Sequence, residues 1–131
     1  MLKVFELGGN PEASNYIFIG DYVDRGNFSV EVLLLLYSIK IFTPKTFIML
    51  RGNHESRQLA EFFNFEAEVK SKYNKNVFDL FIKSFNNLPL GCILNHKFLV
   101  IHGGLSPEFA TLAQLKALTR FSEPPKTGLF W

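Results

Sequence analysis

Three short strings in this chain combine the side-chain types that metal-dependent hydrolases use. They are residues 20–26 (GDYVDRG), 51–55 (RGNHE) and 101–104 (IHGG), which together offer carboxylate, amide, imidazole and guanidinium groups. Each string comes at the end of an apolar, strand-like run, so each is expected where a strand ends and the chain turns. The combination at three strand ends is typical of a site that hydrolyses phosphate esters with bound metals.

Asp21, Asn53 and His102 are the residues of these strings that we expect to bind metal. Asp21 offers a carboxylate that can bridge two cations, Asn53 an amide oxygen and His102 an imidazole nitrogen. Such nitrogen and oxygen ligands suit Zn, Fe or Mn better than Ca or Mg. Two metals roughly 3.5–4 Å apart would hold a hydroxide, lower its pKa and orient a phosphoryl group for in-line attack.

Further side chains of the strings can act on the substrate. We assign Arg25 and Asn53 to phosphate binding. The guanidinium of Arg25 can donate to two phosphate oxygens at once. His54 is expected to protonate the leaving oxygen, with Asp24 holding its ring and raising its pKa. Each residue alone is a common turn, cap or surface residue. His96 is the contrasting case, since we expect an exposed hairpin residue without a catalytic role.

The elements that must position these residues follow from the apolar pattern. Residues 16–19 and 46–50 are expected to form buried strands. A helix over about residues 30–40, capped by Ser29, should connect them. This is a βαβ unit with parallel strands, so the first two strings lie at carboxyl ends of strands, where α/β sheets place their ligands.

The rest of the chain is expected to add helices and a hairpin. The pattern predicts one or two short helices over residues 56–69 and an amphipathic helix over residues 77–88. The strands of the hairpin are residues 91–94 and 97–101, which turn at Asn95-His96 and position His102. The remaining predictions are a helix end that stops at Gly8-Gly9, a helix from Thr111 to about residue 118, and a loop over residues 123–128.

Length and composition predict one globular domain. The 131 residues are 47% hydrophobic, and most of the 15 phenylalanines are expected in the core. A net charge of +2 gives no sign of nucleic-acid binding, and the most apolar stretch, residues 30–42, is too short to span a bilayer. The single cysteine, Cys92, is expected to be a small buried side chain, which fits a reducing compartment such as the cytoplasm or nucleus.

The strings GDYVDRG, RGNHE and HGGLSPE (residues 102–108) resemble the phosphoprotein phosphatase family of serine/threonine phosphatases. The resemblance covers essentially the whole chain, and the strings at residues 44–46 (PKT), 53–57 (NHESR) and 121–128 (FSEPPKTG) look closest to its calcineurin-type members. It implies a mixed α/β metallophosphoesterase fold, with a central β-sandwich flanked by helices and two metal ions, iron with zinc or manganese.

The resemblance also assigns roles to individual residues. It implies that Asp21 bridges both metals, and that Asn53 and His102 bind the second one. It implies further that His54 donates the proton, that Asp24 is its carboxylate partner, and that Arg25 binds phosphate.

The family's pattern extends beyond both ends of this chain. Its Gly-Asp-x-His-Gly motif, which supplies two ligands of the first metal, precedes the part that resembles residues 1–9. A last metal-binding histidine and a second phosphate-binding arginine follow residue 131. We therefore expect residues 1–131 to be a partial catalytic domain, with an incomplete β-sandwich and an incomplete ligand set.

For a full-length protein, the resemblance implies hydrolysis of phosphoserine and phosphothreonine in proteins by a metal-activated hydroxide. Calcineurin-type members also imply a calcium-sensing regulatory subunit and calmodulin as partners. The chain alone is expected to have little or no activity. Two alternatives stay open, which are a non-catalytic truncated or binding fragment and a hydrolase of small phosphoesters such as dinucleoside polyphosphates. The string HGGLSP and the helical residues 56–88 favour protein substrates over the latter.

Overall fold

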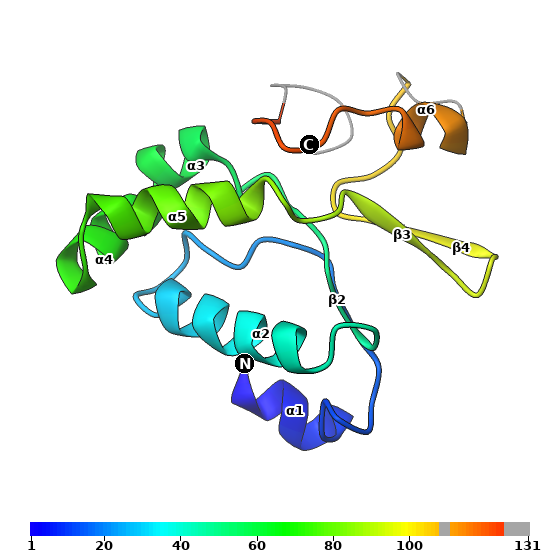
Figure 1. The fold of residues 1–131 in the computed structure, drawn as a ribbon, viewed down its shortest axis with the longest axis horizontal. Helices are drawn as coiled ribbons and strands as arrows, with labels where there is room; N and C mark the ends of the chain where they lie inside the picture. The colour runs from blue at the N-terminus through cyan, green and yellow to red at the C-terminus, as the bar shows by residue number, and fades with distance from the viewer. Residues whose placement is uncertain (108–110, 125–131) are drawn as a thin grey trace.

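The computed structural model describes residues 1–107 and 111–124, and these residues form six helices and four strands (Figure 1). The helices are α1 (Leu2–Gly8), α2 (Ser29–Phe42), α3 (Arg57–Phe62), α4 (Phe65–Lys72), α5 (Lys75–Phe85) and α6 (Leu112–Lys116). The strands are β1 (Tyr16–Phe18), β2 (Phe47–Met49), β3 (Gly91–Leu94) and β4 (Phe98–Ile101). The predicted mixed α/β class is confirmed.

The predicted βαβ unit is present. β1 and β2 pair in parallel, with Tyr16 opposite Phe47 and Phe18 opposite Met49, and α2 connects them and packs against β2. Both strands are shorter than predicted. β1 ends because the chain turns at Gly20, whose φ is 102°, although the Leu50 N–H still donates to the Phe18 carbonyl at 2.8 Å. The first two strings, residues 20–26 and 51–55, therefore lie just beyond the carboxyl ends of the paired strands β1 and β2.

The start of α2 differs from the prediction that Ser29 caps it. Phe28 is the N-cap residue and makes no side-chain cap hydrogen bond, and Ser29 is the first residue of the helix. The N–H of Val30 instead donates to Oε1 of Glu68 in α4 at 2.9 Å. A carboxylate from another helix therefore does what a serine hydroxyl was expected to do. The helix also continues past residue 40, to Phe42.

Two apolar clusters hold the helices and the parallel strands together. The larger one lies among α2, α4 and α5 and includes the fully buried Phe65, Phe78 and Phe85, together with Val23 from the loop after β1. The smaller one joins α2 to the strands through Leu36, Phe47 and Met49, and α1 packs on it. Several other phenylalanines lie on the surface and contribute no core: Phe28, Phe42, Phe62, Phe98 and Phe121.

The helices between the second and third strings follow the prediction closely. α3 and α4 are the two expected short helices, and Ser56 caps α3 by accepting a hydrogen bond from the Leu59 N–H. The amphipathic helix is α5, which begins two residues early because Asn74 caps it, and ends at Phe85 rather than residue 88.

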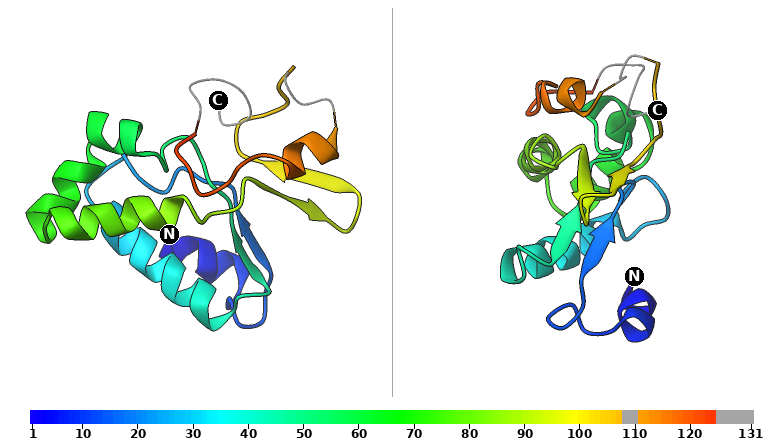
Figure 2. Two further views of the ribbon diagram at one scale, coloured as in Figure 1. Left: turned by 45° about the horizontal axis from the view of Figure 1, so that its top comes forward. Right: turned by 90° about the vertical axis from the view of Figure 1, so that its right-hand side faces the viewer.

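The hairpin is the second small sheet. β3 and β4 are antiparallel, and the turn places Asn95 and His96 at φ of 51° and 56°. His96 is exposed as predicted. Cys92 is only half-buried, so the prediction of a buried side chain is wrong, because its hairpin is covered on one side at most; the partial burial raises the pKa of its thiol. In Figure 1 and in the left view of Figure 2 the hairpin extends away from the α2–α5 helices. Among the described residues β3 and β4 pair with no other strand, so the sandwich is incomplete in this chain, as expected.

The last described helix, α6, has the predicted cap. The hydroxyl of Thr111 accepts from the Gln114 N–H, and the Gln114 side chain accepts from the Thr111 N–H, which makes a capping box. The helix ends at Lys116, two residues before the predicted end. Of the predicted loop over residues 123–128, only 123 and 124 lie within the described residues, and Glu108 of the third string lies outside them. No helix of residues 1–107 and 111–124 is long and apolar enough to cross a bilayer.

Candidate active site

The loop after β1 turns tightly around two aspartates. Asp21 and Asp24 both have positive φ, 57° and 68°. Aspartate enters this left-handed region more readily than most residues because its short side chain can form local hydrogen bonds. The loop remains attached to the core through Val23, which is buried among helix side chains. The two carboxylates are therefore fixed on either side of a buried anchor.

The loops after β1 and β2 touch through two glycines. A Cβ on Gly20 would lie 2.6 Å from the Gly52 Cα, and a Cβ on Gly52 would lie 2.6 Å from the Asp21 nitrogen. Real Cβ atoms do not tolerate such contacts, so only glycine permits this approach. The short distance between the two backbones is what places Asp21 beside Asn53.

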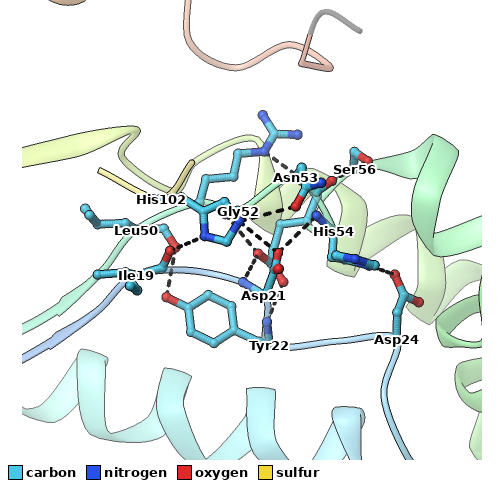
Figure 3. A network of polar contacts seen from close by, with 12 residues as sticks. Ile19, Asp21, Tyr22, Asp24, Leu50, Gly52, Asn53, His54, Ser56 and His102 are labelled. Carbon is cyan, nitrogen blue, oxygen red and sulfur yellow. Dashed lines mark hydrogen bonds and ion pairs between the residues drawn. The ribbon is translucent and has the colours of Figure 1, made fainter. Parts of the chain in front are cut away.

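Asp21, Asn53 and His102 converge, as their positions at strand ends predict. His102 Nε2 lies 3.3 Å from Asn53 Oδ1 and 3.3 Å from Asp21 Oδ1, and Figure 3 shows the three side chains pointing toward one another. The residue that follows β4 and residues of both loops thus meet at one point, although Asp21 and His102 are 81 positions apart in the sequence.

The chemistry of this meeting point fits a cation. His102 Nδ1 lies 2.6 Å from the carbonyl oxygen of Ile19, which can only accept, so Nδ1 carries a proton and Nε2 is the nitrogen that faces the other two side chains. There it meets an amide oxygen and a carboxylate oxygen, which are both acceptors. Three such atoms are held together by a positive charge among them, which a proton on Nε2 or a bound metal ion would supply.

The ligand set includes an amide. Among the described parts of the chain, no three His, Cys, Asp or Glu side chains form a group that could hold a metal. Asp21 and His102 are two such side chains, and the oxygen of Asn53 completes the trio. These residues fit one metal with open positions, and ligands from elsewhere would be needed for a closed site.

His54 and Asp24 form a buried pair next to this cluster. His54 Nδ1 lies 2.8 Å from Asp24 Oδ2, and both side chains are almost inaccessible to solvent. The other oxygen, Asp24 Oδ1, accepts from the Phe65 N–H at the start of α4, at 3.0 Å. The carboxylate is thus anchored at both oxygens and fixes the ring, which leaves Nε2 as the nitrogen that can give a proton to a bound group.

Arg25 lies on the His54 side of the site and is exposed. Its Nη1 donates to the Asp24 carbonyl at 2.9 Å, and its guanidinium lies 5.2 Å from the centre of the Phe63 ring. The same ring is 5.1 Å from the His54 ring. Phe63, which the sequence analysis gave no role, therefore packs near both the predicted proton donor and the predicted phosphate-binding side chain.

All residues 1–131 match the family model of calcineurin-like phosphoesterases. The chain belongs to this family. Membership in a metallophosphoesterase family implies divalent metal ions, in agreement with the cluster of nitrogen and oxygen atoms. It also confirms the resemblance on which the residue-by-residue roles depend, although those roles stay predictions.

Curated relatives of this calcineurin-like chain are named as serine/threonine-protein phosphatases. It is 47% identical over 129 residues to phosphatase 2B catalytic subunit A2 of Saccharomyces cerevisiae and 45% identical over 131 residues to phosphatase 5 of Arabidopsis thaliana. Each alignment covers 98% of this chain, but only 21% and 24% of those relatives. The chain therefore spans less than a quarter of their length.

A solved structure supports the same fold. A protein serine/threonine phosphatase from Saccharomyces cerevisiae, described as similar to human phosphatase PP5, superimposes with a TM-score of 0.91 at 44% identity. The match covers 98% of this chain and 42% of that one. The incomplete sandwich of this calcineurin-like chain is therefore part of a known phosphatase fold.

Two residues of the second string, Arg51 and Glu55, were given no role from sequence. Glu55 is fully buried, and its carboxylate accepts from the N–H groups of Asp21, Tyr22 and Gly52. Burial raises the pKa of Glu55 to about 7, and the three N–H donors oppose that rise. The signal in the sequence was an acidic residue directly after two predicted site residues, but nothing local showed that it faces the other loop.

Arg51 ties the same loop to the helical region. Its Nε donates to the Glu55 carbonyl at 2.8 Å, and its two terminal nitrogens donate to Asn86 Oδ1 and to the Ser122 carbonyl, both at 2.7 Å. Burial lowers the pKa of Arg51, while the negative charges of Glu123 and Glu55 oppose the shift. This guanidinium therefore ties the loop after β2 to the end of α5 and to the segment after α6.

Proposed function

We propose that this chain forms part of the active site of a metal-dependent serine/threonine protein phosphatase. The observation that supports this most is the convergence of three nitrogen and oxygen atoms, from Asp21, Asn53 and His102, beside the buried His54–Asp24 pair. The names of its relatives favour protein substrates over small phosphoesters such as dinucleotides.

The metal-holding residues in this proposal are Asp21, Asn53 and His102. Asp21 would hold both metals of a two-metal site, and Asn53 and His102 would hold the second. Iron with zinc, or manganese, suits these nitrogen and oxygen donors. When bound, the metals make water a nucleophile at neutral pH and polarise the phosphoryl group.

The other residues act on the substrate. Arg25 and Asn53 bind phosphoryl oxygens, and the exposed guanidinium of Arg25 is accessible to a substrate from solvent. His54 gives a proton from Nε2 to the leaving serine or threonine oxygen. Asp24 keeps Nδ1 protonated and the ring oriented, since its own position is set by the start of α4.

The wider assignments in this proposal depend on the family resemblance. Residues 1–131 are a partial catalytic domain, whose substrates in the complete protein are phosphoserine and phosphothreonine proteins in the cytoplasm or nucleus. A calcium-sensing subunit and calmodulin are the proposed partners, because relatives of the phosphatase 2B type align along 98% of this chain. The chain by itself has little activity, because most ligands of the first metal lie elsewhere.

The test is metal binding together with phosphate release. We expect the wild-type chain to bind Mn²⁺ in a calorimetric titration and Asp21→Asn to lose most of that affinity, with His96→Ala as a matched control outside the site. A full-length protein should release phosphate from a phosphoserine peptide faster than from a dinucleoside tetraphosphate. Unchanged Mn²⁺ affinity in Asp21→Asn, or the reverse substrate preference, would contradict the proposal.

A further inference from the structure

Glu55 joins the two loops that contain Asp21 and Asn53. Its Oε2 accepts from the Asp21 N–H at 2.7 Å and from the Gly52 N–H at 2.9 Å. Its Oε1 accepts from the Tyr22 N–H at 2.7 Å. One buried side chain therefore holds the backbone of Asp21, a predicted metal ligand, and the backbone of Gly52, which precedes the predicted ligand Asn53.

Three converging N–H donors require a carboxylate. Its two oxygens can accept all three hydrogen bonds, and its charge strengthens each of them. A glutamine in the same place has one oxygen, so its NH₂ group would face at least one N–H donor. Because Glu55 is fully buried, water cannot replace a hydrogen bond that is lost there.

The chain around Glu55 is fixed at two further points. Arg51 Nε donates to its backbone carbonyl at 2.8 Å. The ring of Tyr22 spans the space below the loop, and its hydroxyl donates to the Leu50 carbonyl at 2.8 Å (Figure 3). The Glu55 carboxylate therefore has a fixed position, and both loops are hydrogen-bonded to it.

We propose that Glu55 is a positioning residue, whose carboxylate sets the spacing of the two loops so that Asp21 and Asn53 face His102. This inference rests on the proposed metal-dependent function. Groups that orient metal ligands typically contribute 10–100-fold to metal affinity. The effect of Glu55 is thus expected on the metal site itself and not only on folding.

The experiment compares two isosteric variants of buried glutamates. Glu55→Gln disturbs the loops, and Glu68→Gln disturbs a carboxylate that also accepts a buried N–H, from Val30, but outside the site. Co²⁺ is titrated into each folded protein and followed by its visible absorption. We expect Glu55→Gln to bind Co²⁺ about 10–100-fold more weakly than wild type with a changed spectrum, and Glu68→Gln to match wild type.

A second measurement needs no variant and so does not depend on Glu55→Gln folding. Amide hydrogen exchange of the wild-type chain is measured with and without Zn²⁺. Zn²⁺ should slow exchange at Asp21, Tyr22 and Gly52, and leave the Val30 amide unchanged. Exchange at the three amides that does not respond to bound Zn²⁺ would overturn the positioning role.

The outcomes separate this inference from the proposed function. If wild type and both variants bind Co²⁺ equally with the same spectrum, Glu55 is only structural and the metal-dependent function stands. If wild type binds neither Co²⁺ nor Zn²⁺, the proposed function and the positioning role are both overturned.

Discussion

The loops that follow β1 and β2 differ from the hairpin that ends at His102 in how they are held. The loops touch through Gly20 and Gly52, share the buried Glu55, and are anchored in the helical core. The hairpin shows apolar side chains to solvent, and Phe98 is 61% exposed. An apolar hollow of about 290 Å³ lies between it and α6.

The residues of one site are therefore held in position in two different ways. Asp21 and Asn53 are positioned by buried polar contacts that small changes would break. His102 comes from an open element and is positioned mainly by its own hydrogen bond to the Ile19 carbonyl. Substitutions should therefore be costly in and under the loops and mild on the hairpin, apart from His102 itself.

The largest difference is expected between two histidines. In the full-length protein His54→Asn should lower the kcat of the proposed reaction by about 10²–10⁴-fold, because the proposed general acid is lost. His96→Asn, on the exposed hairpin turn, should leave kcat unchanged. Steady-state kinetics on a phosphopeptide measure both, and a His54→Asn variant with near-normal kcat would remove His54 from the mechanism.

The packing of the core and of the hairpin can be compared by truncating one phenylalanine in each. Phe85→Ala should lower the free energy of unfolding by about 3–5 kcal/mol, because Phe85 is fully buried in the cluster that anchors Val23. Phe98→Ala should change it by less than about 0.5 kcal/mol, since most of that ring is already in water. Urea unfolding of both variants gives the values, and equal losses would mean that the hairpin is as tightly packed as the core.

Two glycines test the contact between the loops. Gly52→Ala should cost about 3 kcal/mol, because the new Cβ would lie 2.6 Å from the Asp21 nitrogen and 2.8 Å from Glu55 Oε2. Gly26→Ala has open space around it and should cost only the strain of its φ of 71°, about 1 kcal/mol. Thermal unfolding distinguishes them, and a mild Gly52→Ala variant would show that the loops can move apart.

The smallest effect is a pH dependence at Glu68, outside the site. Burial alone would raise its pKa, but the Val30 N–H and Lys72 together hold the pKa below the ordinary value of 4.5. A lowered carboxyl pKa stabilises the fold above pH 4.5, and this stability is lost as the pH falls through the folded-state pKa. Glu68→Gln should therefore be less stable than wild type by about 1 kcal/mol at pH 7, and the difference should shrink by pH 3. A difference that stays constant with pH in urea titrations would rule this out.

Local patterns were sufficient to predict much of this fold. Apolar runs gave both parallel strands, and Asn95-His96 gave the hairpin turn, because strand period and turn chemistry are encoded in neighbouring residues. The same runs placed Asp21, Asn53 and His102 at strand ends, from which their convergence followed.

What could not be predicted are the polar contacts between distant segments. Glu68 caps a helix 38 positions earlier in the chain, and Glu55 accepts hydrogen bonds from a loop 33 positions away. Such contacts have no periodicity, and either glutamate would also fit an exposed surface. From the local sequence Ser29 was the expected N-cap residue, which would make residue 30 the first of the helix. The helix instead begins at Ser29, with Phe28 in the N-cap position.

The anchoring of Asp24 has a consequence for how this site can be controlled. Because one carboxylate oxygen holds His54 and the other accepts from the first N–H of α4, the imidazole is mechanically coupled to that helix. Any rotation or fraying of the first turn of α4 releases the ring from its orientation. Events on the helical side of the molecule can thus reach the proposed proton donor without touching a proposed metal ligand.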